Sequence, residues 1–379
     1  MNILFNMFSP AYGGGFKTYN YNILKGLKKH ANSKNQYFVI LNRNSVQDFD
    51  LPISDNIHII TVSNFFSSTM LRYFWLQIFL PVYLLNKKIN TLFSPMNVSP
   101  VLLFFLKMRS VLVIHTNLPW LYPEALNEQP WYYNFLQKLL TNISIYRADR
   151  IIVDSNTAKR ELIDIFPKIY AKTKRVYLGI DQKKFKKSNK NIQISNRINI
   201  FKEEYFLTVS SVTRYHCFLE LIDAYKKFFE KNHKVPKLLF VSNVISRSYY
   251  KEVLQAVKKS GLSANIIFIT NLKSGLLPTL YQNSELYIFS SYCEVFGFTN
   301  LEAMACGIPV LTSDKSALPE ICQDAAMYFD PFDSVDIYEK INFVFNNKKI
   351  QRSLIEKGYN QVNKYPWETT VKETFEILS

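Results

Sequence analysis

The sequence predicts an α/β protein with two domains, each built on a parallel β-sheet. Short apolar runs rich in β-branched and aromatic residues alternate with longer segments of helical spacing, which is typical of parallel sheets. The chain has 379 residues, enough for two separate hydrophobic cores. A segment rich in Lys, Asn and Ser, residues 181–196, interrupts the alternation and predicts a linker between the domains.

The first half of the chain begins with a strand, a glycine run and a helix. Residues 13–15 are three consecutive glycines, followed by a helix predicted over Tyr19–His30. They match neither a Walker loop nor the spaced dinucleotide pattern. The run is either a plain connection or a wall without side chains that a ligand can approach closely. The strands predicted in this half are Ile3–Phe5, Tyr37–Leu41, Ile57–Val62, Thr91–Pro95 and Ser110–His115, and residues 148–162 are predicted to form a further strand, a polar cap and a helix.

Two stretches of the first half are helical and unusually aromatic, residues 69–85 and Trp120–Ser144. For Trp120–Ser144, a buried helical face explains the aromatics first, and contact with an acceptor or a membrane is the alternative. The most apolar region, residues 65–106, contains charges and prolines. No run in it reaches the roughly 20 apolar residues that span a bilayer, so no transmembrane segment is predicted.

The second half repeats the strand and helix alternation. A helix predicted over Phe218–Phe229 follows its first strand, and the turn between them contains Arg214 and His216. Ligands of open α/β sheets collect at the carboxyl ends of strands, so Arg214 is a candidate ligand-binding residue as well as a candidate surface charge. The strands predicted here are Tyr205–Ser211, Lys237–Ser242, Asn265–Thr270, Leu286–Phe289 and Val310–Thr312.

The most informative stretch of the chain is Glu294–Glu302. It follows the predicted strand Leu286–Phe289, and Gly297 within it allows a backbone to approach a ligand. Thr299 is predicted to cap a helix that begins at Asn300. The free amides of such a helix start suit a phosphate.

The two acids of this stretch are suited to sugar hydroxyls, which donate hydrogen bonds to carboxylates. Glu294 is a lone acid in an apolar and aromatic loop. Glu302 has a second explanation, because Thr299–Glu302 also fits a capping box in which the acid only binds the first amides of the helix. The arrangement as a whole suits a nucleotide sugar.

The stretch Glu294–Val310, with seven residues between its two acids and the string Glu-Ala-Met-Ala-Cys-Gly-Ile-Pro-Val, strongly resembles the E-x7-E signature of retaining GT-B-fold glycosyltransferases (group 1, family 4-like). This resemblance implies two Rossmann-like domains that face a central cleft. Residues 1–185 would bind the acceptor, residues 196–364 would bind the nucleotide sugar, and residues 365–379 would cross back to the first domain.

The resemblance also implies roles for individual residues. Glu302 would bind the ribose hydroxyls and Glu294 the donor sugar. Arg214 would neutralise the diphosphate, with His216 standing where relatives commonly have Lys. The diphosphate would also meet the backbone amides of Gly297, Phe298, Thr299 and Asn300.

In the first domain, His115 would lie near the reacting sugar carbon. Thr116 follows it where many relatives have Asp. Gly14 and Gly15 would approach the donor phosphate. In the second domain, residues 271–273 would contact the nucleobase.

The function that this resemblance implies is transfer of a hexose-type sugar, with retention, from a UDP-, GDP- or dTDP-linked donor to a glycan or lipid-linked acceptor in surface polysaccharide synthesis, such as O-antigen or capsule. The resemblance implies a family that uses no metal, and no cofactor is expected. A nucleotide-sugar epimerase or phosphorylase with the same fold, or a scaffold without turnover, are the alternatives.

The charge of the chain is strongly asymmetric. The net charge is +16, and residues 1–190 hold 25 Lys and Arg against 10 Asp and Glu, whereas the remaining residues hold 21 against 20. Solubility and coding bias explain part of this excess, and an anionic membrane surface or acceptor is the other explanation. No nucleic-acid motif accompanies the charge.

Location is predicted from the N-terminus and the cysteines. The first residues lack the features of a signal peptide, and the four cysteines show no metal-ligand spacing. We therefore expect reduced thiols in a cytoplasmic protein. The resemblance and the basic first half imply that it can bind the inner face of the membrane peripherally.

Overall fold

The computed structural model describes residues 1–8, 14–49, 54–85, 87–101, 108–126, 130–187, 203–233, 235–270, 272 and 274–379. The chain divides into two compact units. The first contains Met1–Gly179 and Trp367–Ser379, and the second contains Ile180–Pro366. The sequence placed the boundary between residues 185 and 196, whereas the division of the structure follows Gly179.

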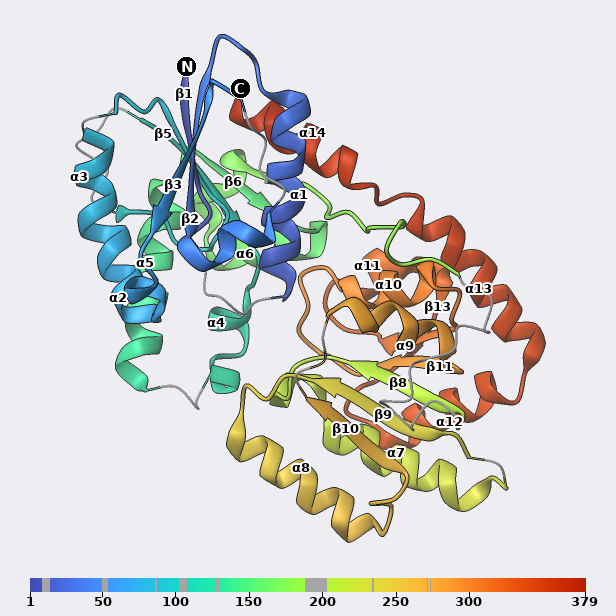
Figure 1. Cartoon of the computed structure of the whole chain (residues 1–379). Coiled ribbons are helices and arrows are strands. Elements are labelled where there is room, and N and C mark those ends of the chain that lie inside the picture. Colours follow the sequence, from blue (N-terminus) through green and yellow to red (C-terminus); the bar gives the residue numbers. More distant parts are fainter. Residues whose placement is uncertain are drawn as a thin grey trace. The chain divides into compact units, whose positions relative to one another are not determined.

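The first unit is built on a parallel sheet with the strand order β3-β2-β1-β4-β5-β6-β7 (Figure 1). The order reverses between β1 and β4, which makes this a doubly wound sheet. Its strands are β1 (Asn2–Asn6), β2 (Gln36–Asn42), β3 (Ile57–Val62), β4 (Thr91–Ser94), β5 (Arg109–Ile114), β6 (Arg150–Val153) and β7 (Thr173–Arg175).

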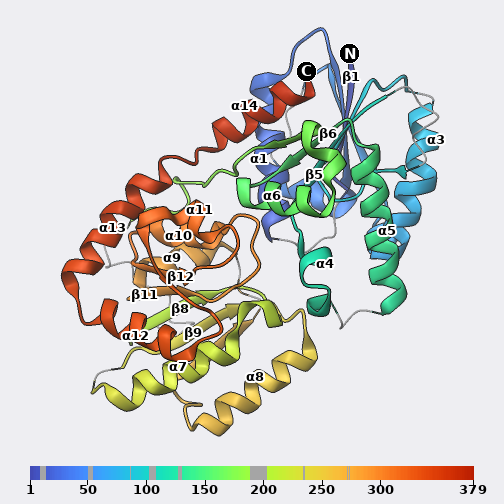
Figure 2. The same ribbon diagram turned by 180° about the vertical axis from the view of Figure 1, so that it is seen from behind.

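Helices cover both faces of this sheet. Figures 1 and 2 show α2, α3 and α5 on one side of the strands, and α1 and α14 next to each other on the other side. Leu4, Ile40 and Leu92 of the sheet pack with Leu80 of α3 in one buried cluster. The helices are α1 (Gly14–His30), α2 (Thr69–Phe74), α3 (Leu80–Leu85), α4 (Leu118–Leu121), α5 (Trp131–Arg147), α6 (Asn156–Ile165) and α14 (Trp367–Leu378), with 3-10 turns at Arg43–Asp48, Asn64–Ser67, Pro123–Leu126 and Pro167–Lys172.

The second unit has a six-stranded parallel sheet with the order β10-β9-β8-β11-β12-β13. The order reverses between β8 and β11, so the loops after these two strands leave at the switch point where open α/β sheets bind ligands. Phe206, Phe218, Phe228 and Ile337 lie in its core. The strands are β8 (Tyr205–Val209), β9 (Lys237–Ser242), β10 (Ile266–Thr270), β11 (Leu286–Phe289), β12 (Val310–Ser313) and β13 (Ala326–Phe329).

Helices pack around this second sheet as well. The longer ones are amphipathic, and α7 buries Phe218, Leu221 and Tyr225 against the strands. The helices are α7 (Phe218–Lys231), α8 (Arg247–Ser260), α9 (Leu277–Asn283), α10 (Phe298–Ala305), α11 (Leu318–Cys322), α12 (Ser334–Phe345) and α13 (Lys348–Val362), with 3-10 turns at Arg214–His216, Ser274–Leu276 and Gln323–Ala325.

The two predicted parallel sheets are confirmed, with three differences in detail. Helix α1 begins at Gly14 rather than at Tyr19, so Gly14 and Gly15 form its first turn. The helical region predicted over Trp120–Ser144 is two helices, because Pro123 starts a separate 3-10 turn and Pro130 precedes the start of α5. The short edge strands β7 and β13 were not predicted.

Two further properties concern the membrane and the thiols. No helix in the described ranges is long and apolar enough to cross a membrane. Cys217, Cys293, Cys306 and Cys322 are all free thiols.

Candidate functional site

The loop between β11 and α10 is shaped by Gly297. Its φ of +97° belongs to the left-handed region, and a Cβ there would lie 2.7 Å from Cδ2 of Leu318. Only glycine avoids both the strain and the clash. Gly297 itself precedes the helix, which begins at Phe298 and has no side-chain cap. The prediction that Thr299 caps a helix beginning at Asn300 is therefore wrong, because the helix starts two residues earlier.

Asn300 lies in the first turn of α10 and is fully buried. Neither atom of its side-chain amide has a hydrogen-bond partner among the residues that the structure describes. A Cβ on Gly297 would lie 3.3 Å from Nδ2 of Asn300, so this amide borders the start of the helix. A buried amide without partners is costly, and a ligand or water bound at the helix start would satisfy it.

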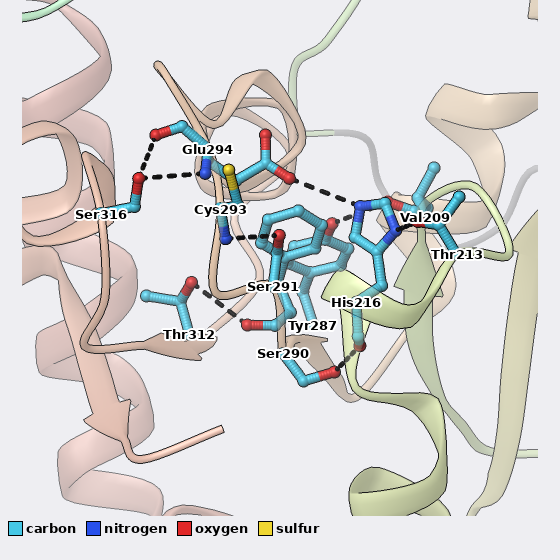
Figure 3. A network of polar contacts seen from close by, with 11 residues as sticks. Val209, Thr213, His216, Tyr287, Ser290, Ser291, Cys293, Glu294, Thr312 and Ser316 are labelled. Atoms are coloured by element: carbon cyan, nitrogen blue, oxygen red, sulfur yellow. Dashed lines mark hydrogen bonds and ion pairs between the residues drawn. The ribbon is translucent and has the colours of Figure 1, made fainter. Parts of the chain in front are cut away.

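Glu294 is held by its backbone while its carboxylate stays accessible. The hydroxyl of Ser316 donates to the carbonyl of Glu294 at 2.6 Å and accepts from its amide at 3.1 Å (Figure 3). The amide of Ala317 donates to the same carbonyl at 3.2 Å. The side chain of Glu294 is 22% exposed. This arrangement fixes the direction of the carboxylate without occupying it with backbone donors.

His216 is buried and supports Glu294. Its Nδ1 lies 2.8 Å from the hydroxyl of Thr213, and its Nε2 lies 3.4 Å from Oε1 of Glu294 (Figure 3). The hydroxyl of Ser290 donates to the His216 carbonyl at 2.6 Å. Both ring nitrogens thus point at protein groups, and β8 and β11 are linked through one side chain. The structure thus points neither ring nitrogen of His216 outward.

Arg214 lies on the same turn but is half-exposed. Its Nη2 donates to Oε1 of Glu252 at 2.6 Å, and its guanidinium carbon lies 5.0 Å from the ring centroid of Tyr249. Exposed ion pairs contribute little free energy, about 0–1 kcal/mol. An anionic ligand can therefore compete with Glu252 for this guanidinium.

Glu302 is not part of a capping box. The hydroxyl of Tyr281 donates to its Oε2 at 3.0 Å, and this contact joins α9 to α10. Burial raises the pKa of Glu302 to about 7, while the hydrogen bond from Tyr281 and the charge of Lys184 act in the opposite direction. The carboxylate is thus poised between its two protonation states near neutral pH.

In the first unit, His115 and Asp154 form a buried pair. They follow the neighbouring strands β5 and β6, and Nδ1 of His115 lies 2.8 Å from Oδ2 of Asp154. The side-chain oxygen of Asn97 accepts from the backbone amide of His115 at 2.7 Å. Burial raises the pKa of Asp154, and His115 counteracts this shift. Within the described residues, Nε2 of His115 has no hydrogen-bond partner.

Aromatic rings from α1 enclose this histidine. The rings of Phe16 and Tyr19 approach His115 edge to face, with centroids at 5.2 and 4.7 Å. Burial raises the pKa of Tyr19 far above its usual value. The first turn of α1, with Gly14 and an exposed Gly15, lies just before these two aromatics in the chain. A ligand group bound at Nε2 of His115 would therefore also lie near these aromatic rings.

The structure brings the predicted residues together in two groups. Glu294, His216 and Gly297 converge at the switch point of the second sheet, while His115 belongs to the first unit. Of the predicted nucleobase segment, residues 271 and 273 lie outside the described residues. The sequence did not identify Asp154, Tyr281, Ser316 and Glu252, because each acts through a contact between distant elements. Only the place of Asp154 after a strand was a usable signal.

Within the described ranges, no group of three or more His, Cys, Asp and Glu side chains could hold a metal ion. The expected absence of a metal and of a cofactor stays a prediction.

The family described as "Glycosyl transferases group 1" matches residues 189–361, and "Glycosyltransferase Family 4" matches residues 13–184. An uncharacterized glycosyltransferase of Methanocaldococcus jannaschii is 25% identical over 62% of this chain and 61% of its own length. The O-antigen chain mannosyltransferase B of Escherichia coli is 30% identical over 34% of each protein. The chain thus spans from a third to about three fifths of these relatives.

Among solved structures, HepE of Anabaena in complex with UDP and glucose is similar in fold. Its TM-score is 0.77 at 18% identity, and the match covers 100% of this chain and 99% of HepE. WaaG, a glycosyltransferase involved in lipopolysaccharide biosynthesis, is also similar in fold, with a TM-score of 0.69 at 14% identity over 100% of this chain and 99% of WaaG. The predicted GT-B fold is therefore confirmed.

Proposed function

Because this chain belongs to the group 1 glycosyl transferases, we propose that it transfers a hexose-type sugar from a nucleotide sugar to a glycan or lipid-linked acceptor. The product would be part of a surface polysaccharide such as an O-antigen or a capsule. The relative in Escherichia coli, an O-antigen chain mannosyltransferase, supports this class of product.

One observation carries the proposal, the position of two carboxylates on either side of the α10 N-terminus. Glu294 lies three residues before Gly297, and Glu302 lies one turn inside the helix. Helix N-termini bind phosphates through free amides and the helix dipole. A diphosphate at Gly297–Asn300 would therefore lie between one acid for the donor sugar and another for the ribose.

The diphosphate is the leaving group, so its developing charge must be stabilised. We assign this task to the amides at the start of α10 and to Arg214, whose pairing with Glu252 is exposed and easily exchanged. His216 is assigned an indirect role through Glu294, since its ring is buried between Thr213 and that acid. The buried amide of Asn300 is a further candidate donor.

We further propose that the reaction proceeds with retention by front-face attack. The acceptor hydroxyl bonds to the anomeric carbon as the bond to the diphosphate breaks, and the hydroxyl proton passes to the departing phosphate oxygen. A double displacement needs a carboxylate free to attack that carbon. Asp154 is buried against His115 and is not suited to this role. His115 is assigned to the donor sugar through its Nε2.

The first experiment identifies the donor. Thermal shifts are measured with a panel of UDP-, GDP- and dTDP-linked sugars, and we expect one family of nucleotides to raise Tm. The variant Glu302→Gln should weaken binding of both the nucleotide sugar and the free nucleotide. Glu294→Gln should weaken only binding of the nucleotide sugar. Absence of any shift across the panel would contradict the proposal and favour a scaffold without turnover.

The second experiment identifies the reaction. The donor is incubated with and without candidate glycan acceptors, and the anomeric configuration of the product is determined by NMR. Transfer with the donor's own configuration is the expected result. An isomerised nucleotide sugar formed without acceptor would indicate an epimerase instead, and release of a sugar phosphate would indicate a phosphorylase.

The place of action is also a proposal. We expect the enzyme at the cytoplasmic face of a membrane, where a lipid-linked acceptor is available. The basic first half of the chain supports this expectation.

A further inference from the structure

The helical segment of residues 69–85 is apolar on both of its faces. It consists of α2, a π-helical turn at Trp75–Phe79, and α3. One face is buried in the core of the first unit through Leu76, Leu80 and Leu84. The opposite face is also apolar but faces solvent, and Phe74 is 52% and Val82 58% exposed. A helix on the surface of a soluble protein normally has polar residues there.

Helix α5 lies beside this segment and has an exposed apolar stripe of its own. Trp131 is 77% and Phe135 63% exposed, and Leu139 continues the stripe one turn later. The rings of Tyr73 and Tyr133 approach to 6.5 Å, which joins α2 to α5. Figures 1 and 2 both show α2, α3 and α5 on the same side of the first sheet. The exposed apolar residues of these three helices are called the apolar surface below.

The three helices that form the apolar surface contain no acidic residue. The sequence contains no Asp or Glu between residues 56 and 123, and none within α5. The one charged residue of segment 69–85, Arg72, is buried. Lys87 and Lys88 follow α3 directly and are exposed. Acidic residues, which solvate the surfaces of most soluble proteins and would repel an anionic partner, are missing from these helices.

We propose that the apolar surface docks on an anionic lipid bilayer. Its aromatic and aliphatic side chains would enter the headgroup boundary, and Lys87 and Lys88 would meet the lipid phosphates. Exposed aromatics beside basic residues are the combination that interfacial helices use. The benefit of this binding rests on the proposed function, because a lipid-linked acceptor lies in such a membrane. The binding itself requires neither substrate.

A second copy of the chain fits the apolar surface less well than a bilayer does. Self-association would bring Lys87 and Lys88 of two copies towards each other without any acid on α2, α3 or α5 to compensate. An anionic bilayer instead supplies the missing negative charge. Charge complementarity therefore favours the lipid surface.

The test is sedimentation of the full-length protein with vesicles. We expect binding to vesicles of phosphatidylcholine with phosphatidylglycerol, and much weaker binding to phosphatidylcholine alone. Raising the salt concentration should weaken binding, because the lysine contribution is screened. Lys87→Gln/Lys88→Gln should reduce the partition coefficient by about fivefold for each lysine. The matched control, Lys258→Gln/Lys259→Gln, changes two exposed lysines at the end of α8 and should have no effect.

The apolar contribution is tested with Phe74→Ser/Phe135→Ser, which should reduce the partition coefficient at least tenfold. Its control is Val335→Ser/Phe343→Ser, which removes two exposed apolar residues of α12 in the second unit. All four residues are exposed, so both variants should fold, and far-UV circular dichroism checks this. Tryptophan emission should shift to the blue with anionic vesicles, and Trp131→Phe should remove most of the shift.

Three results would overturn the proposal. If Val335→Ser/Phe343→Ser loses as much vesicle binding as Phe74→Ser/Phe135→Ser, the apolar surface is not the part of the protein that binds the bilayer. Binding that depends on neither anionic lipid nor salt would exclude the charge argument. Finally, dimerisation in analytical ultracentrifugation that Phe74→Ser/Phe135→Ser abolishes, without vesicle binding by either protein, would assign the surface to a second copy. Nucleotide-sugar binding by the same variants should be unchanged, which separates this test from that of the proposed function.

Discussion

Each unit of this protein places a histidine beside a carboxylate at the carboxyl edge of its sheet, but the two pairs are built differently. His115 and Asp154 are 2.8 Å apart, and their side chains are 9% and 1% exposed. His216 and Glu294 are 3.4 Å apart, and the acid is partly exposed. In the first pair the histidine keeps a ring nitrogen without a partner among the described residues. In the second pair both ring nitrogens face protein groups, and the acid remains accessible.

This difference indicates that the histidine and the acid have opposite roles in the two units. In each pair one residue orients the other, and the oriented residue faces the ligand. Asp154 orients His115, whereas His216 orients Glu294. Ligand contact is therefore expected from a neutral or cationic nitrogen in the first unit and from a carboxylate in the second. Substitutions of the ligand-facing member should be more damaging than those of its support.

The largest effect is expected for Glu294→Gln. A carboxylate that accepts two hydrogen bonds from the donor sugar contributes roughly 3–4 kcal/mol, so kcat/KM should fall by about 10²- to 10³-fold. Initial rates with the donor identified by thermal shift measure this. The matched variant His216→Gln removes only the support and should cost about tenfold. If His216→Gln is as damaging as Glu294→Gln, the exchange of roles proposed for the second unit is wrong.

Glu302 is a third acid, and its hydrogen-bond partner is Tyr281 rather than a histidine. Because its pKa is raised to about 7, the folded protein keeps a proton that the unfolded chain loses near pH 4.5. Stability should therefore fall as pH rises from about 4.5 to 7 and stay constant above. Glu302→Gln should remove this dependence and stabilise the protein at pH 8 by up to about 3 kcal/mol.

Thermal unfolding of both proteins between pH 4.5 and 8 measures this effect. The gain should vanish at the acidic end of the range, where Glu302 is protonated in both states. Weaker nucleotide binding should accompany the gain in stability if this acid holds the ribose. A variant that is stabilised equally at every pH would show that burial of the charge is not the cause.

Some of these features could be predicted from the sequence, and others could not. The alternation of strands and helices predicted both sheets. The strand Leu286–Phe289, the loop with Gly297 and the helix after it were also predicted, although the helix begins at Phe298. The prediction at Thr299 is wrong because the cap was inferred from residue type alone, whereas Gly297 is the residue that precedes the helix. The burial of His216 between Thr213 and Glu294 could not be predicted either, since it depends on the contact of β8 with β11. Asp154 could not be identified for the same reason, because its contact with His115 joins distant parts of the chain.

A smaller effect is expected for Asp154→Asn, which tests the first pair. The variant keeps the shape of the side chain but removes its charge, so kcat should fall by about tenfold. The KM for the donor should change little, because Asp154 does not face the ligand. The pH profile of kcat should also shift, since the variant removes a buried carboxyl whose pKa is raised by burial. Asp164→Asn, an exposed acid on α6, is the control. An unchanged pH profile in Asp154→Asn would refute its role as support.

The smallest effect is expected at Arg214, which lies beside the second pair but is bound to Glu252 rather than to His216 or Glu294. If the donor diphosphate must displace Glu252, then Glu252→Gln should free the guanidinium and lower the donor KM by two- to threefold, in keeping with the small free energy of exposed ion pairs. Arg214→Gln should raise the donor KM, and the two substitutions should not be additive. Glu230→Gln on α7 removes another exposed acid and should change nothing. If Glu252→Gln leaves the donor KM unchanged or raises it, this ion pair positions Arg214 for the diphosphate instead of competing with it.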